Sequence, residues 1–123
     1  MTIVSETYTN FRIINALAIT DVAVHQSSIS DVSRYTVNTF FVNNALDQAV
    51  SVQIYGNITN SVTGAVTIGA AFTVATVDQE SRTFTSNTAG WMPYIYIVVT
   101  AAVIPTSGTI TANLLCRNPS SVR

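Results

Sequence analysis

The stretch GWMPYIYIVVTAAVIPTSGTITANLL, residues 90–115, decides the fold, because it is strongly apolar and holds no charged residue. Its densest apolar part, residues 91–104, is shorter than the roughly 20 residues that a membrane-spanning helix requires. Residues 94–99 are all aromatic or β-branched, and residues 105–108 (PTSG) have the composition of a turn. Polar and apolar residues then alternate over residues 109–114. The sequence therefore predicts a β-hairpin here, not a membrane span or a buried helix.

The composition extends this prediction to the whole chain of 123 residues, which is the length of one domain. There are 18 Thr, 16 Val and 12 Ile but only four Leu, and lysine is absent. Branching at Cβ disfavours helices and suits a pleated sheet. Turn residues recur about every ten positions, which indicates about eight antiparallel strands. We predict an all-β protein, a single β-sandwich of the jelly-roll type.

The strands can be placed approximately. We expect the heart of the core in the two strands of the hairpin, at alternating apolar positions: Ile95, Ile97, Val99, Ile110, Ala112 and Leu114. Further strands are predicted at residues 11–19, 35–42, 50–54, 65–77 with a bulge or bend at Gly69, and 82–85. Residues 20–34 are expected to be a connection, residues 78–82 a solvated loop, and residues 44–48 the one place for a helical turn. We divide the chain into an N-terminal arm (1–10), the β-sandwich (11–117) and a C-terminal tail (118–123).

Charge is scarce, and this limits the partners. Charged residues make up 9% of the chain, against a usual share of about 25%, and the net charge is −1. The five Arg are scattered without a basic stripe, so we expect no nucleic-acid partner. The N-terminus lacks the basic region of a secretory signal, and no segment is long enough to span a membrane. Little like-charge repulsion keeps copies apart, which suits a protein that packs against other copies or another protein.

Candidate catalytic groups are few. His25 is the only histidine and could form a Ser-His-Asp arrangement with Asp21 or Asp31, but the nucleophile-elbow motif G-x-S-x-G is absent. Cys116 precedes Arg117, which could lower the pKa of the thiol, yet its place at the end of an apolar strand favours an inert buried thiol. We therefore predict that the protein is not an enzyme.

Metal and cofactor sites are not expected either. One His and one Cys far apart in the chain cannot form a zinc site. Asp78 and Glu80 could share one face of an extended segment and bind calcium through their oxygen atoms, but a solvated loop is the favoured interpretation. We expect no cofactor and no metal.

Three segments carry a resemblance to a known group of proteins: VNNALDQAVSVQIYGN (42–57), TGAVTIGAAFTVA (63–75) and the stretch 90–115 with its GW-x-PY corner and P-x-SG turn. In this order they resemble small phage virion accessory proteins, over residues 35–115. The matching positions are turn and core residues, so they concern the fold more than an activity. The resemblance implies a capsid decoration, head-fibre or similar subunit with a jelly-roll-like sandwich, and it implies no catalytic residue.

The leading hypothesis is therefore a non-enzymatic virion structural protein, assembled in the host cytoplasm, which binds other copies of itself and docks on a major capsid or other virion protein. The alternatives are a carbohydrate- or receptor-binding β-sandwich and a subunit of an extracellular filament. Trp91 is expected to plug the open end of the sandwich, to anchor a partner or to stack on a sugar ring. The residues predicted to lie in an interface are Thr2, Ile3, Val4, Tyr8, Trp91 and Tyr94.

Overall fold

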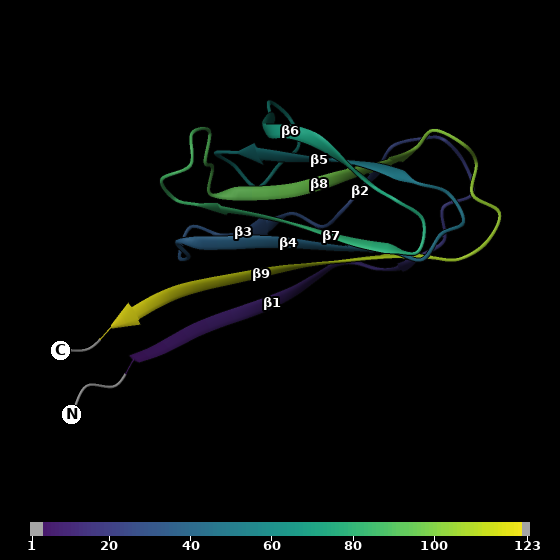
Figure 1. The fold of residues 1–123 in the computed structure, drawn as a ribbon. Helices are drawn as coiled ribbons and strands as arrows, with labels where there is room; N and C mark the ends of the chain where they lie inside the picture. The colour runs from purple at the N-terminus through teal and green to yellow at the C-terminus, as the bar shows by residue number, and fades with distance from the viewer. Residues whose placement is uncertain (1–3, 122–123) are drawn as a thin grey trace.

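A computed structural model describes the backbone of residues 4–121 and the side chains of residues 8–118. Two stacked β-sheets form the molecule (Figure 1), and none of the described residues is helical, so no helix there could cross a membrane. The strands are β1 (Val4–Leu17), β2 (His25–Gln26), β3 (Ser30–Asp31), β4 (Val37–Asn44), β5 (Val50–Asn57), β6 (Val66–Val74), β7 (Asp78–Thr85), β8 (Tyr94–Ala101) and β9 (Ile110–Ser121).

The strand order is that of a jelly roll. Sheet 1 has the order β1-β9-β4-β7, and sheet 2 has the order β2-β8-β5-β6, with β3 also paired to β8. If β2 and β3 are counted as one interrupted strand, the first strand pairs with the last and the second with the last but one. This nesting is the double Greek key of a jelly roll. The predicted all-β sandwich is confirmed.

The core lies between the two sheets and is built from the inward-facing positions of the central strands. In β8 the inward positions 95, 97, 99 and 101 are buried, and in β9 the inward positions 110, 112, 114 and 116 are buried too. All six residues predicted to form the heart of the core are fully buried, which confirms that part of the prediction. Burying each large aliphatic side chain contributes about 1.5–3 kcal/mol, so these two strands anchor the fold.

Three local predictions need correction. Residues 20–34 are not only a connection, because they contribute β2 and β3 to the edge of sheet 2. Residues 78–82 are not a loop, because they form the first part of β7, which pairs with β4 along its whole length. Residues 44–48 form no helical turn, since the side chain of Asn44 accepts the amide hydrogen of Leu46 and bends the chain there.

The bulge predicted at Gly69 is confirmed. Gly69 has φ 69°, a left-handed conformation that glycine adopts without strain. The register between β5 and β6 shifts between Val52 and Ile54, so residues 69–71 of β6 lie opposite a single residue of β5. The extra residues carry this part of β6 out of the regular ladder.

The two chain ends form a ribbon. β1 and β9 pair from Leu17 with Ile110 to Val4 with Ser121, and the outer part of this pair projects beyond the body of the sandwich (Figure 1). Residues 4–10 of the predicted arm thus pair with residues 115–121, which include most of the predicted tail. The division of the chain into arm, sandwich and tail stays a prediction. Thr2 and Ile3 lie outside the described residues.

Candidate functional site

Four connections meet at the end of the sandwich that lies opposite the chain termini (Figure 1). In sheet 1 the terminal residues of four strands lie side by side, in the order Leu17, Ile110, Asn44 and Asp78. In sheet 2 the corresponding end row is Ala101, Val50 and Val74. The connections 18–24, 45–49, 75–77 and 102–109 therefore share one end, which we call the distal end.

Asn44 holds two of these connections together from inside. Its side chain is fully buried, and its Nδ2 atom donates to the carbonyl oxygens of Gln48 at 3.0 Å, Val74 at 3.1 Å and Ala75 at 3.2 Å. Its Oδ1 atom accepts the amide hydrogen of Leu46 at 3.0 Å. One buried carboxamide thus supplies hydrogen bonds to backbone groups in the turns after β4 and β6.

The long connection 102–109 is fastened to the connection 45–49. The backbone nitrogen of Thr106 donates to Oδ1 of Asp47 at 2.9 Å, and the Thr106 hydroxyl donates to the other carboxylate oxygen. These hydrogen bonds from Thr106 hold the pKa of Asp47 below its usual value. Gly108 allows the close approach, because a Cβ atom there would lie 2.0 Å from the carbonyl oxygen of Ala45.

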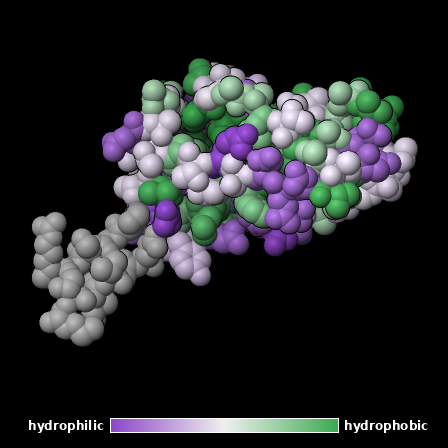
Figure 2. Space-filling view, viewed as in Figure 1, coloured by the Kyte–Doolittle hydropathy of each residue, from purple (hydrophilic) through white to green (hydrophobic). Residues whose placement is uncertain are grey.

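This fixed backbone presents aliphatic side chains to solvent. The distal end carries five of the exposed large hydrophobic side chains, namely Val22 (50% exposed), Val24 (69%), Val77 (84%), Val103 (57%) and Ile104 (53%). Val77 has φ 53°, which is strained for a β-branched residue. Figure 2 shows hydrophobic and hydrophilic side chains intermixed at this end. The charged residues of the four connections and of the adjoining start of β7 are Asp21, Asp47 and Asp78. The distal end therefore presents exposed aliphatic side chains together with acidic groups.

The His-Asp pair predicted as one possibility does form, at the distal end. His25 Nε2 lies 2.7 Å from Asp21 Oδ1, and this hydrogen bond from His25 lowers the pKa of Asp21. A nucleophile is missing from the arrangement, since no serine hydroxyl among the described residues is hydrogen-bonded to His25. The nearby Ser27 hydroxyl instead donates to a carbonyl and accepts the amide hydrogen of Ile97 at 2.9 Å. Asp31 binds the backbone nitrogen of Ser33 at 2.9 Å. The structure assembles no catalytic triad from these residues.

The remaining reactive groups are also occupied or buried. Burial raises the pKa of the Cys116 thiol to about 12, so the thiol is protonated at neutral pH despite its neighbour Arg117. Asp78 and Glu80 share one face of β7, but Glu80 is paired with Arg82 at 3.3 Å. Within the described part of the chain, no cluster of three or more His, Cys, Asp or Glu residues could hold a metal ion.

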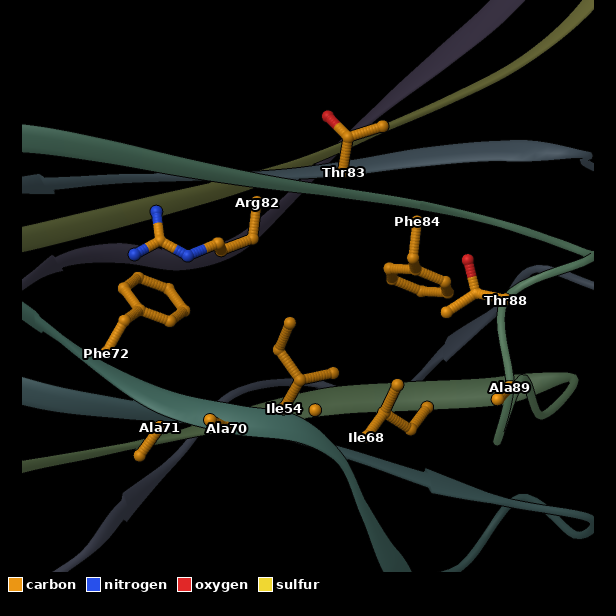
Figure 3. A pocket seen from close by; sticks show the side chains of 11 residues that line it. Ile54, Ile68, Ala70, Ala71, Phe72, Arg82, Thr83, Phe84, Thr88 and Ala89 are labelled. Carbon is orange, nitrogen blue, oxygen red and sulfur yellow. The ribbon is translucent and has the colours of Figure 1, made fainter.

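A groove of about 380 Å³ opens between the edges of β6 and β7 (Figure 3). The bulge of β6 forms one wall with residues 69–71, and the floor is apolar, with Ile54, Ile68 and Phe84. The Arg82 guanidinium lies over the Phe72 ring, 4.2 Å from its centroid (Figure 3), a cation–π contact at the mouth of the groove. The groove could accept an apolar group, and its lining contains no His, Cys, Asp or Glu.

A tyrosine cluster lies on the outer face of sheet 2, and the sequence pattern did not predict it. Tyr55 and Tyr96 are opposite one another in β5 and β8, and their rings stack at a centroid distance of 5.4 Å and an angle of 8°. Tyr94 lies two residues before Tyr96, on the same face. The 94/96 spacing is visible in the sequence, whereas only the register between strands adds Tyr55. Tyr96 is 5% exposed, and Tyr55 and Tyr94 are half-buried.

The predicted interface residues do not share one surface. Tyr8 is 67% exposed on the outer face of sheet 1, where it borders a shallow depression with Leu115. Tyr94 lies on the outer face of sheet 2, on the other side of the sandwich. Trp91 is half-buried against the core, as a plug would be, and its Nε1 atom is buried without a hydrogen-bond partner. Val4 belongs to β1. The role of these residues in an interface stays a prediction.

Comparison with solved structures shows where else this fold occurs. The PBSX exported protein XepA matches with a TM-score of 0.68 and 13% identity over 95% of this chain, and the chain spans 39% of the length of XepA. The SPBc2 prophage-derived protein YomS matches with a TM-score of 0.60 and 14% identity, covering 94% of this chain and 97% of YomS. The chain thus shares its fold with these two phage-derived proteins.

A plant-virus protein has a similar fold too. The coat protein of tobacco streak virus matches with a TM-score of 0.50 and 10% identity, over 96% of this chain and 88% of the coat protein. No protein-family model matches the chain, and no curated protein sequence does. At these identities the likeness concerns the fold alone, and it agrees with the resemblance drawn from the sequence.

Proposed function

We propose that the protein is a non-enzymatic structural subunit of a phage virion, which associates with other copies and docks on a larger protein lattice such as the capsid shell. The observation that carries this proposal is the distal end. Exposed apolar side chains on a surface that is held rigid from inside are typical of a binding surface. The similar folds of XepA, YomS and a viral coat protein support the virion setting.

The side chains of the distal end indicate which chemical groups a complementary partner surface should carry. Side chains such as Val24, Val77 and Val103 require an apolar pocket or groove. The carboxylates of Asp21, Asp47 and Asp78 require basic or hydrogen-bond-donating groups at the rim of that pocket. Because Asn44 and the 102–109 fastening preorganise the backbone, little conformational entropy is lost on docking.

The test compares matched substitutions at the two ends of the sandwich. Val103→Asp places a charge in the distal end, and Ile58→Asp places one at the opposite end, where Ile58 is 72% exposed. Both sites are exposed, so both variants should fold. We expect Val103→Asp to reduce co-sedimentation with intact phage particles at least tenfold and Ile58→Asp to leave it unchanged. Equal losses would refute the distal end as the docking surface, and no binding by the unaltered protein would refute virion docking.

The tyrosine cluster favours carbohydrate binding as a second candidate function, because aromatic rings on a sheet face can stack on sugars. The limited exposure of the rings argues against carbohydrate binding, since Tyr96 is buried and Tyr55 and Tyr94 are only partly accessible. Titration calorimetry with a panel of oligosaccharides tests it. Binding that Tyr55→Ala abolishes would support this function over the structural one.

A further inference from the structure

The outer edge of β1 is open over residues 4–12. β1 is the terminal strand of sheet 1, and no strand within residues 4–121 pairs with its outer side. The register with β9 is regular from Val4 to Arg12, and bulges begin only beyond Arg12. The edge closes at Ile13, whose carbonyl oxygen accepts a hydrogen bond from the Ser28 nitrogen at 3.2 Å. An open edge of this kind presents unpaired N–H and C=O groups to another strand.

Apart from the charges of Glu6 and Arg12, this edge lacks the usual protection against pairing. Residues 4–12 contain neither proline nor lysine, and no bulge twists them away. The outermost part of β1 is supported only by β9, because β4 begins at Val37, opposite Arg117. A ribbon of two strands is marginally stable in water, so a third strand would stabilise it.

The charges of Glu6 and Arg12 favour a second copy of β1 as the pairing strand. Glu6 and Arg12 are six residues apart in the regular part of β1, so they occupy the same face of the strand. They are separated by about 20 Å along the strand and cannot reach each other within one chain. The Arg12 guanidinium donates to two amide oxygens, of Asn113 at 2.7 Å and of Asn15 at 3.3 Å, both neutral. An antiparallel copy of the same strand would place a carboxylate opposite each guanidinium.

We propose that β1 pairs antiparallel with β1 of a second copy, around a two-fold axis at Thr9. Residues 6–12 of each copy would then face residues 12–6 of the other, with Glu6 opposite the partner's Arg12 at both ends. The two copies of sheet 1 join into one continuous sheet, and the same strand serves both copies, as a two-fold interface requires. This inference rests on the self-association in the proposed function but not on docking to a virion.

Disulfide trapping tests the register. In a Cys116→Ala background, Thr9→Cys should form a covalent dimer on oxidation, because identical residues on the axis lie about 5 Å apart. Cys116 must be removed because it lies opposite Thr9 in β9. Tyr8→Cys and Asn10→Cys are matched controls, since each would lie about 7–8 Å from its own copy, too far for a disulfide. Equal or stronger trapping at position 8 or 10 would overturn the register.

Charge reversal tests the pairing independently of any cross-link. Glu6→Arg or Arg12→Glu alone places like charges opposite one another twice per dimer, and should raise the dimer dissociation constant about tenfold or more in sedimentation equilibrium. The double variant exchanges the two charges, so its dimer dissociation constant should be within about threefold of that of the unaltered protein. Thermal melting of each variant verifies folding. A monomeric unaltered protein at all concentrations, or a double variant no better than the singles, would overturn the proposal while leaving docking through the distal end untouched.

Discussion

Replacement of Asn44 by Asp tests whether one buried carboxamide holds the distal end together. The side chain is fully buried, and its two amide hydrogens serve three carbonyl oxygens at 3.0, 3.1 and 3.2 Å. A carboxylate has the same shape but cannot donate. Each hydrogen bond contributes about 1 kcal/mol net, and a buried group left without a partner costs about 1–3 kcal/mol, so we expect the free energy of unfolding to fall by about 3–4 kcal/mol at pH 7.

The pH dependence distinguishes this mechanism from general damage. Burial beside carbonyl oxygens should raise the pKa of the new carboxyl in the folded protein above the ordinary value of about 3.9. The penalty should therefore be smaller near pH 4, where the protonated acid can donate one hydrogen bond, and should grow as the pH rises. Urea denaturation at the two pH values measures it. Asn43→Asp, on the exposed side of the same strand, is the matched control and should change stability by less than about 0.5 kcal/mol. A difference between the two variants below about 1 kcal/mol at pH 7 would refute the reasoning.

Four further outcomes follow from the structure. Gly108→Ala should destabilise the protein by more than about 2 kcal/mol in thermal melts, since its Cβ would overlap a backbone carbonyl, whereas Gly64→Ala, at a similar φ but in open space, should cost only about 1 kcal/mol. The folded protein lowers the pKa of Asp47, so the contribution of this carboxylate to the free energy of unfolding is present above the ordinary carboxyl pKa and is lost as the pH falls through the lowered value. NMR titration of the Thr106 amide should show a midpoint below the ordinary carboxyl pKa. Ile97→Asp should not yield a cooperatively melting protein, because an unpaired charge would lie in the core. Self-association should persist in about 1 M NaCl, because exposed ion pairs contribute little compared with main-chain hydrogen bonds between strands. Dissociation at this salt concentration would show that the interface is mainly electrostatic.

The sequence by itself determined the class of fold and the centre of the core. The unbroken run of aromatic and β-branched residues at positions 94–99 is typical of a strand in the middle of a sheet, and Gly69 indicated a break in the ladder because glycine adopts a left-handed conformation without strain. The sparse charges and the lack of a known reactive motif led the sequence to predict neither nucleic-acid binding nor nucleophilic catalysis, and both stay predictions.

Only the tertiary structure decided which distant segments become neighbours. Exposed valines such as Val24, Val77 and Val103 look like ordinary strand-forming residues in the sequence, and they come to the same end of the sandwich because four connections meet there. The polar composition of the stretch that begins at Asp78 predicts a loop, yet this stretch pairs with β4 and forms a strand. The open edge of β1 likewise depends on sheet order. Local periodicity reports which face of a strand is buried, but strand order and register arise from contacts between residues far apart in the chain, and no local pattern encodes them.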